Sequence, residues 1–466
     1  MKEYTTVEQS SKISRRQFVG TATAGVAATA LLPRTVSGAV VAGSAKGPKL
    51  NVACIGLGWQ MESDLRQIVT LGQNVIALCD LEDSRIPRAK SWVGDAAANA
   101  KGYKDYRTLL EEEKSLDAVI IATPDHWHAP IIKAAMRAGK HIYCEKPLTH
   151  AIGEAREIRE LFRKSKVVTQ TGNQGSASNN LRRNIELIQA GVIGTVTDIH
   201  VWHPAHGWPS GEDRPAGEDP VPKGFDWDFW VGPAPLRPYK NGLYHPVKWR
   251  GWYDFGNGSI GDFCCHAFNL PVRALRLDYP TQIEVSGTGL GKESFAKSCT
   301  LRYRFPKREQ RGPVTLHFYT GGEMPPAEVT KPLADSFGKV GGTGCLLVGD
   351  KGVISAGLWN NDGYLILKGE AKFKGIFSHE AAKLVPTSFR HVNGHMNEWV
   401  DACLGGPQTF SDFDVGGHLT ELGLAGALAL RIGHDIEWDG VKMKVTGIKE
   451  AEAIIHPDYR VGWGGQ

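Results

Sequence analysis

The sequence predicts an α/β protein with two domains: an N-terminal Rossmann dinucleotide-binding domain and a C-terminal α/β domain built on a large, mostly antiparallel open sheet. Three observations carry this prediction. A glycine pair follows the first apolar strand, and an acidic residue ends the second. Strands alternate with helical patterns up to residue 170, which indicates a parallel sheet. Beyond residue 283 apolar and polar residues alternate in successive short runs, which indicates antiparallel strands.

Length and composition narrow the function classes. The 466 residues suffice for two large domains, and the 41% hydrophobic and 22% charged residues exclude a disordered chain. The formal net charge is only +4 and no polybasic run is present, so we expect no nucleic-acid partner. Eight cysteines in so long a chain do not indicate a disulfide scaffold, and a vicinal disulfide at Cys264 and Cys265 is disfavoured by its geometry.

The first 45 residues have the layout of an export signal. Arg15 and Arg16 precede a large apolar residue, and a weakly hydrophobic run follows from Val19 to Leu32. Small residues beyond this run offer cleavage sites, as is typical of the twin-arginine route that exports folded proteins. A membrane anchor is the alternative, but the run is shorter than the ~20 residues that a span needs. We therefore expect a periplasmic protein that keeps no integral membrane segment once residues 1–45 are removed.

The next segment, residues 46–170, has the order of a dinucleotide-binding domain. An apolar strand beginning at Leu50 runs into Gly56 and Gly58, an amphipathic helix follows, and a second strand ends at Asp80. Gly56 permits the tight turn, and Gly58 lets a pyrophosphate approach the helix N-terminus. Asp80 is expected to bind the ribose hydroxyls. Because the acidic residues beside it would repel the 2′-phosphate of NADP, NAD is the predicted cofactor.

The ends of two further strands add predicted cofactor contacts. Met61 replaces the third glycine of the fingerprint, so a turn without a ligand is the alternative for the glycine segment alone. Later strands end near polar residues, which we expect to contact the cofactor because ligands bind beyond the carboxyl ends of parallel strands. These predicted contacts are Thr123, His126, Glu145 and Lys146.

Two motifs lie on this frame. One is Glu-Lys-Pro at residues 145–147, and the other is a glycine-rich run at residues 256–266 with an aspartate and a histidine four residues apart. In this order they resemble the Gfo/Idh/MocA oxidoreductases, which include glucose-fructose oxidoreductase and inositol dehydrogenase. The resemblance covers nearly everything after the signal and implies that residues 171–466 form the second α/β domain. Family members use its sheet to form dimers or tetramers, so a homodimer or homotetramer is expected.

Carried over to the matching positions, the family's catalytic group is Lys146, Asp262 and His266. Oxidising a secondary alcohol requires a base for the hydroxyl proton, and imidazole has the pKa best placed for it. Asp262 and His266 share a face if their segment is helical, so the carboxylate can orient the ring. The Lys146 ammonium can stabilise a developing alkoxide. Taken singly, the motifs are also typical of a solvated turn and a surface pair; their order on a Rossmann frame favours catalysis.

The segment from Trp202 to Trp252 contains six of the 13 tryptophans, interleaved with polar side chains and rich in proline and glycine. We expect a long ordered loop that binds carbohydrate, because aromatic faces stack on sugar rings while polar neighbours bind hydroxyl groups. Some of the tryptophans, Trp227 and Trp230 especially, are expected to fill the core instead. The predicted substrate contacts are His206, Trp208, Arg250 and Trp252.

Histidines and cysteines recur at spacings that occur in metal sites, but no group supplies a complete set of four ligands. We therefore predict no metal. The groups considered are His126 with His128, His203 with His206, Cys264 and Cys265 with His266, and His391 with His395.

Together these features predict an exported oxidoreductase that oxidises, or reversibly reduces, a ring hydroxyl of a sugar, glycoside or polyol by hydride transfer to NAD. Because no pool of free NAD is expected outside the cytoplasm, the cofactor is predicted to be loaded before export and held tightly. One alternative is an NAD-dependent redox-cycling glycosidase or lyase. Lys146 argues against it, because the family's NAD-dependent glycosidases lack this lysine. The other is a non-catalytic sugar-binding protein, against which the retained catalytic group argues.

Overall fold

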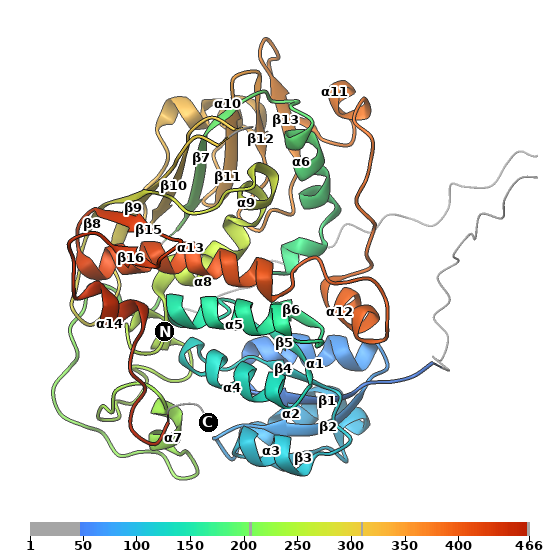
Figure 1. The fold of residues 1–466 in the computed structure, drawn as a ribbon, viewed down its shortest axis with the longest axis vertical. Helices are drawn as coiled ribbons and strands as arrows, with labels where there is room; N and C mark the ends of the chain where they lie inside the picture. Colours follow the sequence, from blue (N-terminus) through green and yellow to red (C-terminus); the bar gives the residue numbers. More distant parts are fainter. Residues whose placement is uncertain (1–46, 205–206, 309–310, 464–466) are drawn as a thin grey trace, which may run out of the picture. The chain divides into compact units, whose positions relative to one another are not determined.

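The computed structural model describes residues 47–204, 207–308 and 311–463 (Figure 1). The predicted signal at residues 1–45 and the predicted substrate contact His206 lie outside these ranges. Within them, no helix combines the length and the apolar character needed to cross a membrane.

The N-terminal domain is a six-stranded parallel sheet with the order β3-β2-β1-β4-β5-β6, which confirms the predicted Rossmann arrangement. Strands β1 and β4 are apolar and nearly fully buried, because separate hydrophobic clusters cover the two faces of the sheet. The strand order reverses between β1 and β4, where such sheets bind ligands. The elements are β1 (Asn51–Ile55), α1 (Trp59–Thr70), β2 (Asn74–Cys79), α2 (Arg85–Val93), β3 (Lys101–Tyr103), α3 (Tyr106–Glu112), β4 (Ala118–Ile121), α4 (Asp125–Arg137), β5 (His141–Cys144), α5 (Ile152–Lys164) and β6 (Thr169–Thr171).

The second domain is built on a ten-stranded sheet with the order β14-β13-β12-β11-β7-β10-β9-β8-β15-β16. Strands β7 and β10 run parallel and the other paired strands run antiparallel, as predicted. The first elements are α6 (Asn179–Gln189), β7 (Val196–His203), α7 (Trp227–Val231), α8 (Gly258–Ala267), α9 (Asn269–Leu275), β8 (Gln282–Thr288), β9 (Ser298–Phe305), β10 (Val314–Thr320) and α10 (Ala327–Phe337). The remaining ones are β11 (Gly344–Gly349), β12 (Gly352–Ser355), β13 (Tyr364–Leu367), β14 (Lys374–Gly375), α11 (Glu380–Lys383), α12 (His395–Cys403), α13 (Phe413–Ile432), β15 (Ile436–Asp439), β16 (Lys444–Val445) and α14 (Ala451–Ile455).

Alternation along the strands separates the two faces of this large sheet. Ile199 and Val201 of β7 belong to the main core, to which α6, α8, α9 and α13 contribute buried side chains. Trp202 points to the opposite face and packs in a smaller cluster with Leu333 of α10. Successive side chains of a strand point to opposite faces, so one strand supplies both layers.

The helices do not follow the predicted domain boundary at residue 170. Helix α12 comes late in the chain but packs beside α1, and its Met396, Trp399 and Val400 are buried in a Rossmann core cluster (Figure 1). Phe413, at the start of α13, is buried in the cluster on the other face of the same sheet. The chain up to β6, which ends at Thr171, forms the parallel sheet and the chain from β7 on forms the larger sheet, whereas the two domains share helices.

Candidate functional site

A cavity of about 540 Å³ lies beyond the carboxyl ends of the Rossmann strands, and residues of the second domain close its other side. We call it the cleft. Of the residues predicted from the sequence, His126, Trp252 and His266 do not line it. Those that do are Gly56, Gly58, Asp80, Thr123, Glu145, Lys146, Trp208, Arg250 and Asp262.

The glycine loop forms the Rossmann side of the cleft. Gly56 has φ +82°, and a Cβ atom there would lie 2.7 Å from the Thr123 backbone nitrogen, so only glycine lets these two strand ends approach each other. Gly58, just before α1, faces open space. The Asp80 carboxylate accepts a hydrogen bond from the Leu57 N–H at 2.7 Å, and burial raises the pKa of Asp80. Asp80 therefore holds the loop in its position.

Polar groups beside this loop fit a dinucleotide. The Thr123 hydroxyl is buried, and no group in the described part of the chain hydrogen-bonds to it. The Glu145 carboxylate accepts a hydrogen bond from the Gln174 amide at 2.9 Å. Burial outweighs the nearby Lys146 charge and raises the pKa of Glu145 to about 7. A loop with glycine at two of its positions, at a helix N-terminus, and an unsatisfied hydroxyl beside it suit the close approach of a cofactor backbone.

Two of the three predicted catalytic residues are in direct contact. Lys146 Nζ donates hydrogen bonds to Asp262 Oδ1 at 2.9 Å and to the Asp262 carbonyl oxygen at 3.0 Å, which joins the end of β5 to α8. Arg250 Nε donates to the same Oδ1 at 3.3 Å. Burial opposes ionisation of Asp262, but the charges of Lys146 and Arg250 outweigh it and hold the pKa of Asp262 below its ordinary value. The ionised carboxylate thus positions both cations at the cleft.

His266, the third predicted catalytic residue, lies one turn after Asp262 on α8 but beneath Trp359. Their ring centroids are 4.3 Å apart in an edge-to-face arrangement. Only 2% of His266 is exposed, whereas Trp359 lines the cleft and is 43% exposed. Burial, followed by the charge of Lys146, lowers the pKa of His266 well below its ordinary value, so the ring is neutral. Trp359 could not be predicted as a site residue, because it lies in the connection between β12 and β13, far in sequence from both motifs.

The neighbouring Asn360 fixes this connection. Asn360 is fully buried and has φ +53°, a left-handed conformation that asparagine tolerates better than most residues. Its side-chain oxygen accepts a hydrogen bond from the Leu270 N–H at 2.8 Å, and its amide donates to the Gly357 carbonyl at 3.1 Å. The backbone that carries Trp359 is therefore anchored to α9.

The first turn of α4 lines the cleft, but not with His126, the residue predicted to contact the cofactor. Helix α4 begins at Asp125, so Asp125 and His128 share a face and line the cleft. His126 is rotated away from this face. It packs against Trp230 and Phe255, with its ring nitrogens 2.9 Å and 3.3 Å from their carbonyl oxygens. The structure thus corrects the prediction of His126 as a cofactor contact, which rested on its position just after a strand end.

Asp125 and His128 are residues of this helix that line the cleft but were not predicted to do so. The ring nitrogens of His128 lie 2.8 Å from the Pro147 carbonyl oxygen and 2.9 Å from that of Thr123, so His128 connects two strand ends. Asp125 accepts a hydrogen bond from the Asn257 amide at 3.0 Å. Burial raises the pKa of Asp125 to about 8, so this carboxyl group holds its proton at neutral pH. The helical spacing of the two residues was the available signal.

Aromatic side chains cover the second-domain side of the cleft. The Arg250 guanidinium carbon lies 4.2 Å from the centroid of the Trp249 ring and 5.9 Å from that of Trp208. An arginine among aromatic faces offers both hydrogen-bond donors and stacking surfaces. The tryptophans that line the cleft are Trp59 and Trp127 of the Rossmann domain and Trp208, Trp230, Trp249 and Trp359 of the second domain.

Trp252 is a core residue, which corrects its prediction as a substrate contact. Its side chain is fully buried, and its Nε1 donates a hydrogen bond to the Leu243 carbonyl at 3.1 Å. Trp227 and Trp230, predicted to fill the core, are buried in a hydrophobic cluster and stack in α7 with centroids 4.9 Å apart; Trp230 also lines the cleft. Because the N–H of Trp252 is hydrogen-bonded and its ring is buried, this indole cannot contact a ligand.

A strap from the second domain, residues 224–250, reaches back to the Rossmann domain. The Gly224 carbonyl accepts a hydrogen bond from the Asp83 N–H at 3.0 Å. His245 Nε2 lies 3.1 Å from a carboxylate oxygen of Glu82. The strap also lines the cleft with His245 and Val247. It therefore bonds to the loop after β2, next to Asp80, and encloses this end of the cleft.

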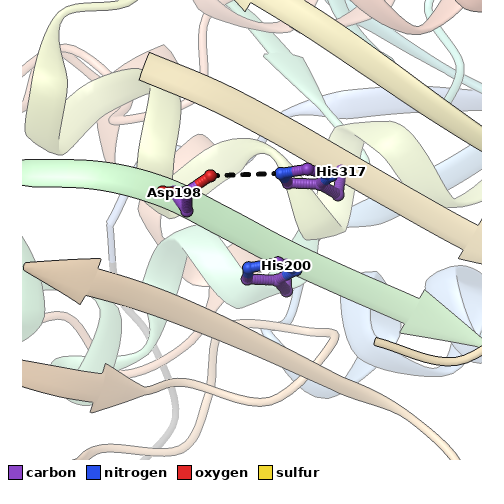
Figure 2. A group of neighbouring side chains, drawn as sticks. All are labelled: Asp198, His200 and His317. Carbon is purple, nitrogen blue, oxygen red and sulfur yellow. Dashed lines mark hydrogen bonds and ion pairs between the residues drawn. The ribbon is translucent and has the colours of Figure 1, made fainter. Parts of the chain in front are cut away.

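The described residues contain one group with metal-ligand chemistry, and it differs from those considered in the sequence (Figure 2). Asp198 and His200 of β7 and His317 of β10 place one ligand atom each within 4.8 Å of the others. The two imidazole rings stack nearly parallel, 6° apart with centroids at 4.5 Å. Nitrogen lone pairs lie in the ring plane, so rings in this arrangement do not point at one ion. His317 Nε2 instead hydrogen-bonds to Asp198 at 3.2 Å.

Two family models match the chain. One is described as "Oxidoreductase family, NAD-binding Rossmann fold" and matches residues 50–173. The other is described as "Oxidoreductase family, C-terminal alpha/beta domain" and matches residues 184–304. Both belong to GFO_IDH_MocA, and together they cover more than half of the chain. They follow the division between the two sheets.

Individual relatives match over shorter stretches. A glycosyl hydrolase family 109 protein of Stenotrophomonas maltophilia is 39% identical over 28% of this chain and 29% of its own length. An inositol 2-dehydrogenase of Salmonella paratyphi B is 29% identical over 33% of this chain and 46% of its own length. The matched part thus spans less than half of each relative. The WlbA dehydrogenase from Bordetella pertussis, solved with NADH and UDP-GlcNAcA, has a TM-score of 0.58 at 15% identity, covering 84% of this chain and 99% of that one.

Proposed function

We propose, from the premise that this chain belongs to the Gfo/Idh/MocA family of oxidoreductases, that it oxidises, or reversibly reduces, a ring hydroxyl of a sugar, glycoside or polyol with NAD. The observation that carries the proposal is the contact between Lys146 and Asp262 in a cleft that the glycine loop also lines. It places a fixed ammonium group next to the position where a dinucleotide fits.

The residues that would hold NAD lie along the Rossmann side of the cleft: the glycine loop, Asp80, Thr123 and Glu145. When bound, the nicotinamide supplies the acceptor for the hydride that leaves the oxidised carbon. The acids around Asp80 support NAD over NADP, because Glu82 remains ionised with its pKa lowered to about 2 by its hydrogen bonds to Ser84 and Arg85, which outweigh its burial. The adjacent carboxylates of Asp80 and Glu82 would repel the 2′-phosphate of NADP.

The chain's own residues account for the proton and the charge. Lys146, held by Asp262, donates to the substrate oxygen and stabilises the negative charge that develops there. The neutral ring of His266 accepts the hydroxyl proton, since its Nδ1 is buried and has no hydrogen-bond partner among the described residues. For a hydroxyl group to reach His266, the indole of Trp359 must move aside.

A sugar suits the other wall of the cleft. Trp208 and Trp359 line the cleft and would stack on the C–H faces of a pyranose ring, and Arg250 would donate hydrogen bonds to its hydroxyl groups. A carbohydrate substrate is therefore proposed over a small keto acid, for which such an aromatic wall has no use.

Export with a tightly held cofactor is part of the same proposal. The twin-arginine pattern supports transport in the folded state. The strap, bonded to the Rossmann domain through Gly224 and His245, encloses the end of the cleft near Asp80 and would slow the release of a bound dinucleotide. The bound NADH would then be re-oxidised without leaving the protein, by transfer of its hydride to a second sugar or to another acceptor.

Two measurements test the proposal. Protein purified from the periplasm should release nicotinamide into an acid extract, and an extract without it contradicts the tightly bound cofactor. A glycoside panel is then screened with the fluorescence of bound NADH as the readout, and the products are weighed by mass spectrometry. Loss of two hydrogens supports oxidation, release of the aglycone identifies a redox-cycling glycosidase or lyase, and unchanged sugars with saturable binding identify a binding protein.

A further inference from the structure

A second cavity, of about 260 Å³, shares no lining residue with the cleft. It is bounded by the last turn of α13, by the connection that contains Tyr253, and by the segment after α14 that contains Tyr459. His126, which the sequence analysis assigned to the cofactor, forms part of its wall. The helix face opposite the cleft thus borders a space of its own.

Arg431 lines this cavity without an anionic partner. It lies in the last turn of α13, and its guanidinium carbon sits 4.9 Å from the centroid of the Tyr253 ring. Throughout the described ranges, no group accepts a hydrogen bond from Arg431 or forms an ion pair with it. Burial lowers the pKa of its guanidinium group. Since arginine remains charged in proteins, a desolvated cation of this kind is costly until an anion binds to it.

The carboxylates around the cavity do not neutralise Arg431. Glu154 accepts a hydrogen bond from the Tyr459 hydroxyl at 2.5 Å, and Asp254 forms an ion pair with Arg237. Asp458 is exposed at the rim. The three acids therefore surround the cavity with negative charge but leave its one free cation unpaired, so the site favours a ligand with a single negative charge over a dianion.

We propose that this cavity binds a small organic anion with one carboxylate group, which pairs with the planar guanidinium of Arg431 through two parallel hydrogen bonds. The volume is below the range of roughly 300–1,000 Å³ that holds drug-sized ligands, which suits a small acid. The site lies outside the cleft and stands independently of the proposed oxidoreductase activity.

The test measures binding of sodium lactate to the purified full chain by isothermal titration calorimetry and by thermal melting, with sodium chloride and sodium phosphate at equal ionic strength as references. Lactate should bind to one site and raise the melting temperature beyond both references, because a ligand that binds only the folded state stabilises it. Equal effects of lactate and chloride, or a larger effect of phosphate, would overturn the proposal.

Three variants locate the site. Arg431→Met should weaken lactate binding at least tenfold without lowering the melting temperature of the ligand-free protein, because it removes an unpaired buried charge. Lys146→Met, in the cleft, and Arg308→Met, on the exposed surface, should bind lactate as the parent does. Loss of binding in Lys146→Met together with retention in Arg431→Met would place the ligand in the cleft and refute the second site.

A further variant keeps the test valid if Arg431→Met does not fold. Ala453 is exposed and lines the cavity, so Ala453→Phe blocks the space while leaving Arg431 in place. It should also weaken lactate binding at least tenfold. Unchanged binding in this variant would contradict the proposed location.

Discussion

Two buried clusters in this protein place two cations on one carboxylate, and they differ in what they leave unsatisfied. In the structural cluster, Glu421 of α13 accepts hydrogen bonds from Arg156 at 2.8 and 3.0 Å, from Arg159 at 2.7 Å and from the Tyr279 hydroxyl at 2.8 Å. In the cleft, Asp262 binds both of its cations through the single atom Oδ1.

The number of unsatisfied carboxylate oxygens distinguishes the structural cluster from the cleft. Both oxygens of Glu421 are saturated, and only 2% of the residue is exposed, so the cluster fixes α13 against α5 and offers nothing to a ligand. No donor in the described ranges reaches Oδ2 of Asp262, and Lys146 and Arg250 both line a cavity. Charge pattern alone therefore does not identify a site; residual hydrogen-bonding capacity next to an open volume does.

The largest expected effect comes from breaking the cleft cluster. Lys146→Met should lower kcat/KM by about 10⁴-fold, equivalent to about 5.4 kcal/mol, because it removes the ammonium that stabilises the alkoxide. Steady-state kinetics on a substrate from the glycoside panel give the ratio, and the melting temperature should stay near that of the parent. Lys133→Met, which removes a buried lysine paired with Glu157 outside the cleft, is the matched control. Equal losses in the two variants would rule out a catalytic contribution of Lys146.

Breaking the structural cluster should act on stability instead. Glu421→Gln leaves the buried Arg159 and the half-buried Arg156 facing a neutral amide, which should lower the free energy of unfolding by about 3–5 kcal/mol. Urea denaturation measures this change. The folded fraction should retain the parent's KM.

Glu284 provides the control for this variant, because it pairs with Arg302 and Arg304, whose side chains are 40% and 45% exposed. Glu284→Gln should cost less than about 1 kcal/mol. If the Glu421 and Glu284 variants lose the same stability, burial is not the reason for the difference.

Asp125 extends the comparison to a buried carboxyl group in the cleft that forms no ion pair with the described residues. Its folded-state pKa is raised from 3.8 to about 8, so the folded protein holds a proton that the unfolded chain releases. Stability should therefore fall as pH rises between these values, by at most about 2.7 kcal/mol from pH 5 to pH 7. Asp125→Asn should flatten this dependence. Urea denaturation at several pH values checks it, and an unchanged slope would show that Asp125 ionises normally.

The smallest expected effect concerns the aromatic side of the cleft. Trp359→Ala should raise KM about tenfold with kcat within a factor of three, because a stacking surface worth about 1.4 kcal/mol is lost from substrate binding. Trp359→Phe should restore most of the affinity. The control is Phe377→Ala, an aromatic residue that is 59% exposed and absent from the cleft lining. A fall in kcat with unchanged KM would contradict a binding contribution of Trp359.

Features encoded within a few residues could be predicted from the sequence. The glycine turn, the acid at the end of the second strand and the strand-end residues Glu145 and Lys146 all follow from local patterns on a parallel sheet, whose carboxyl ends meet at one edge. The family resemblance placed Lys146 and Asp262 in one catalytic group, and the structure brings their side chains into contact. The exchange of His126 for Asp125 and His128 shows the limit of this reasoning: helix α4 already begins at Asp125, so its first turn directs Asp125 and His128, and not His126, to the cleft.

Only the tertiary structure decided the rest. Trp359 covers His266 although the two residues are 93 positions apart in the sequence. The cavity that Arg431 lines is formed by segments that are far apart in the sequence. The sequence also does not show that Glu421 is saturated while Asp262 retains a free oxygen. The physical reason is that a side chain's chemical identity is local, whereas its burial, its partners and its unsatisfied atoms depend on which distant elements pack against it.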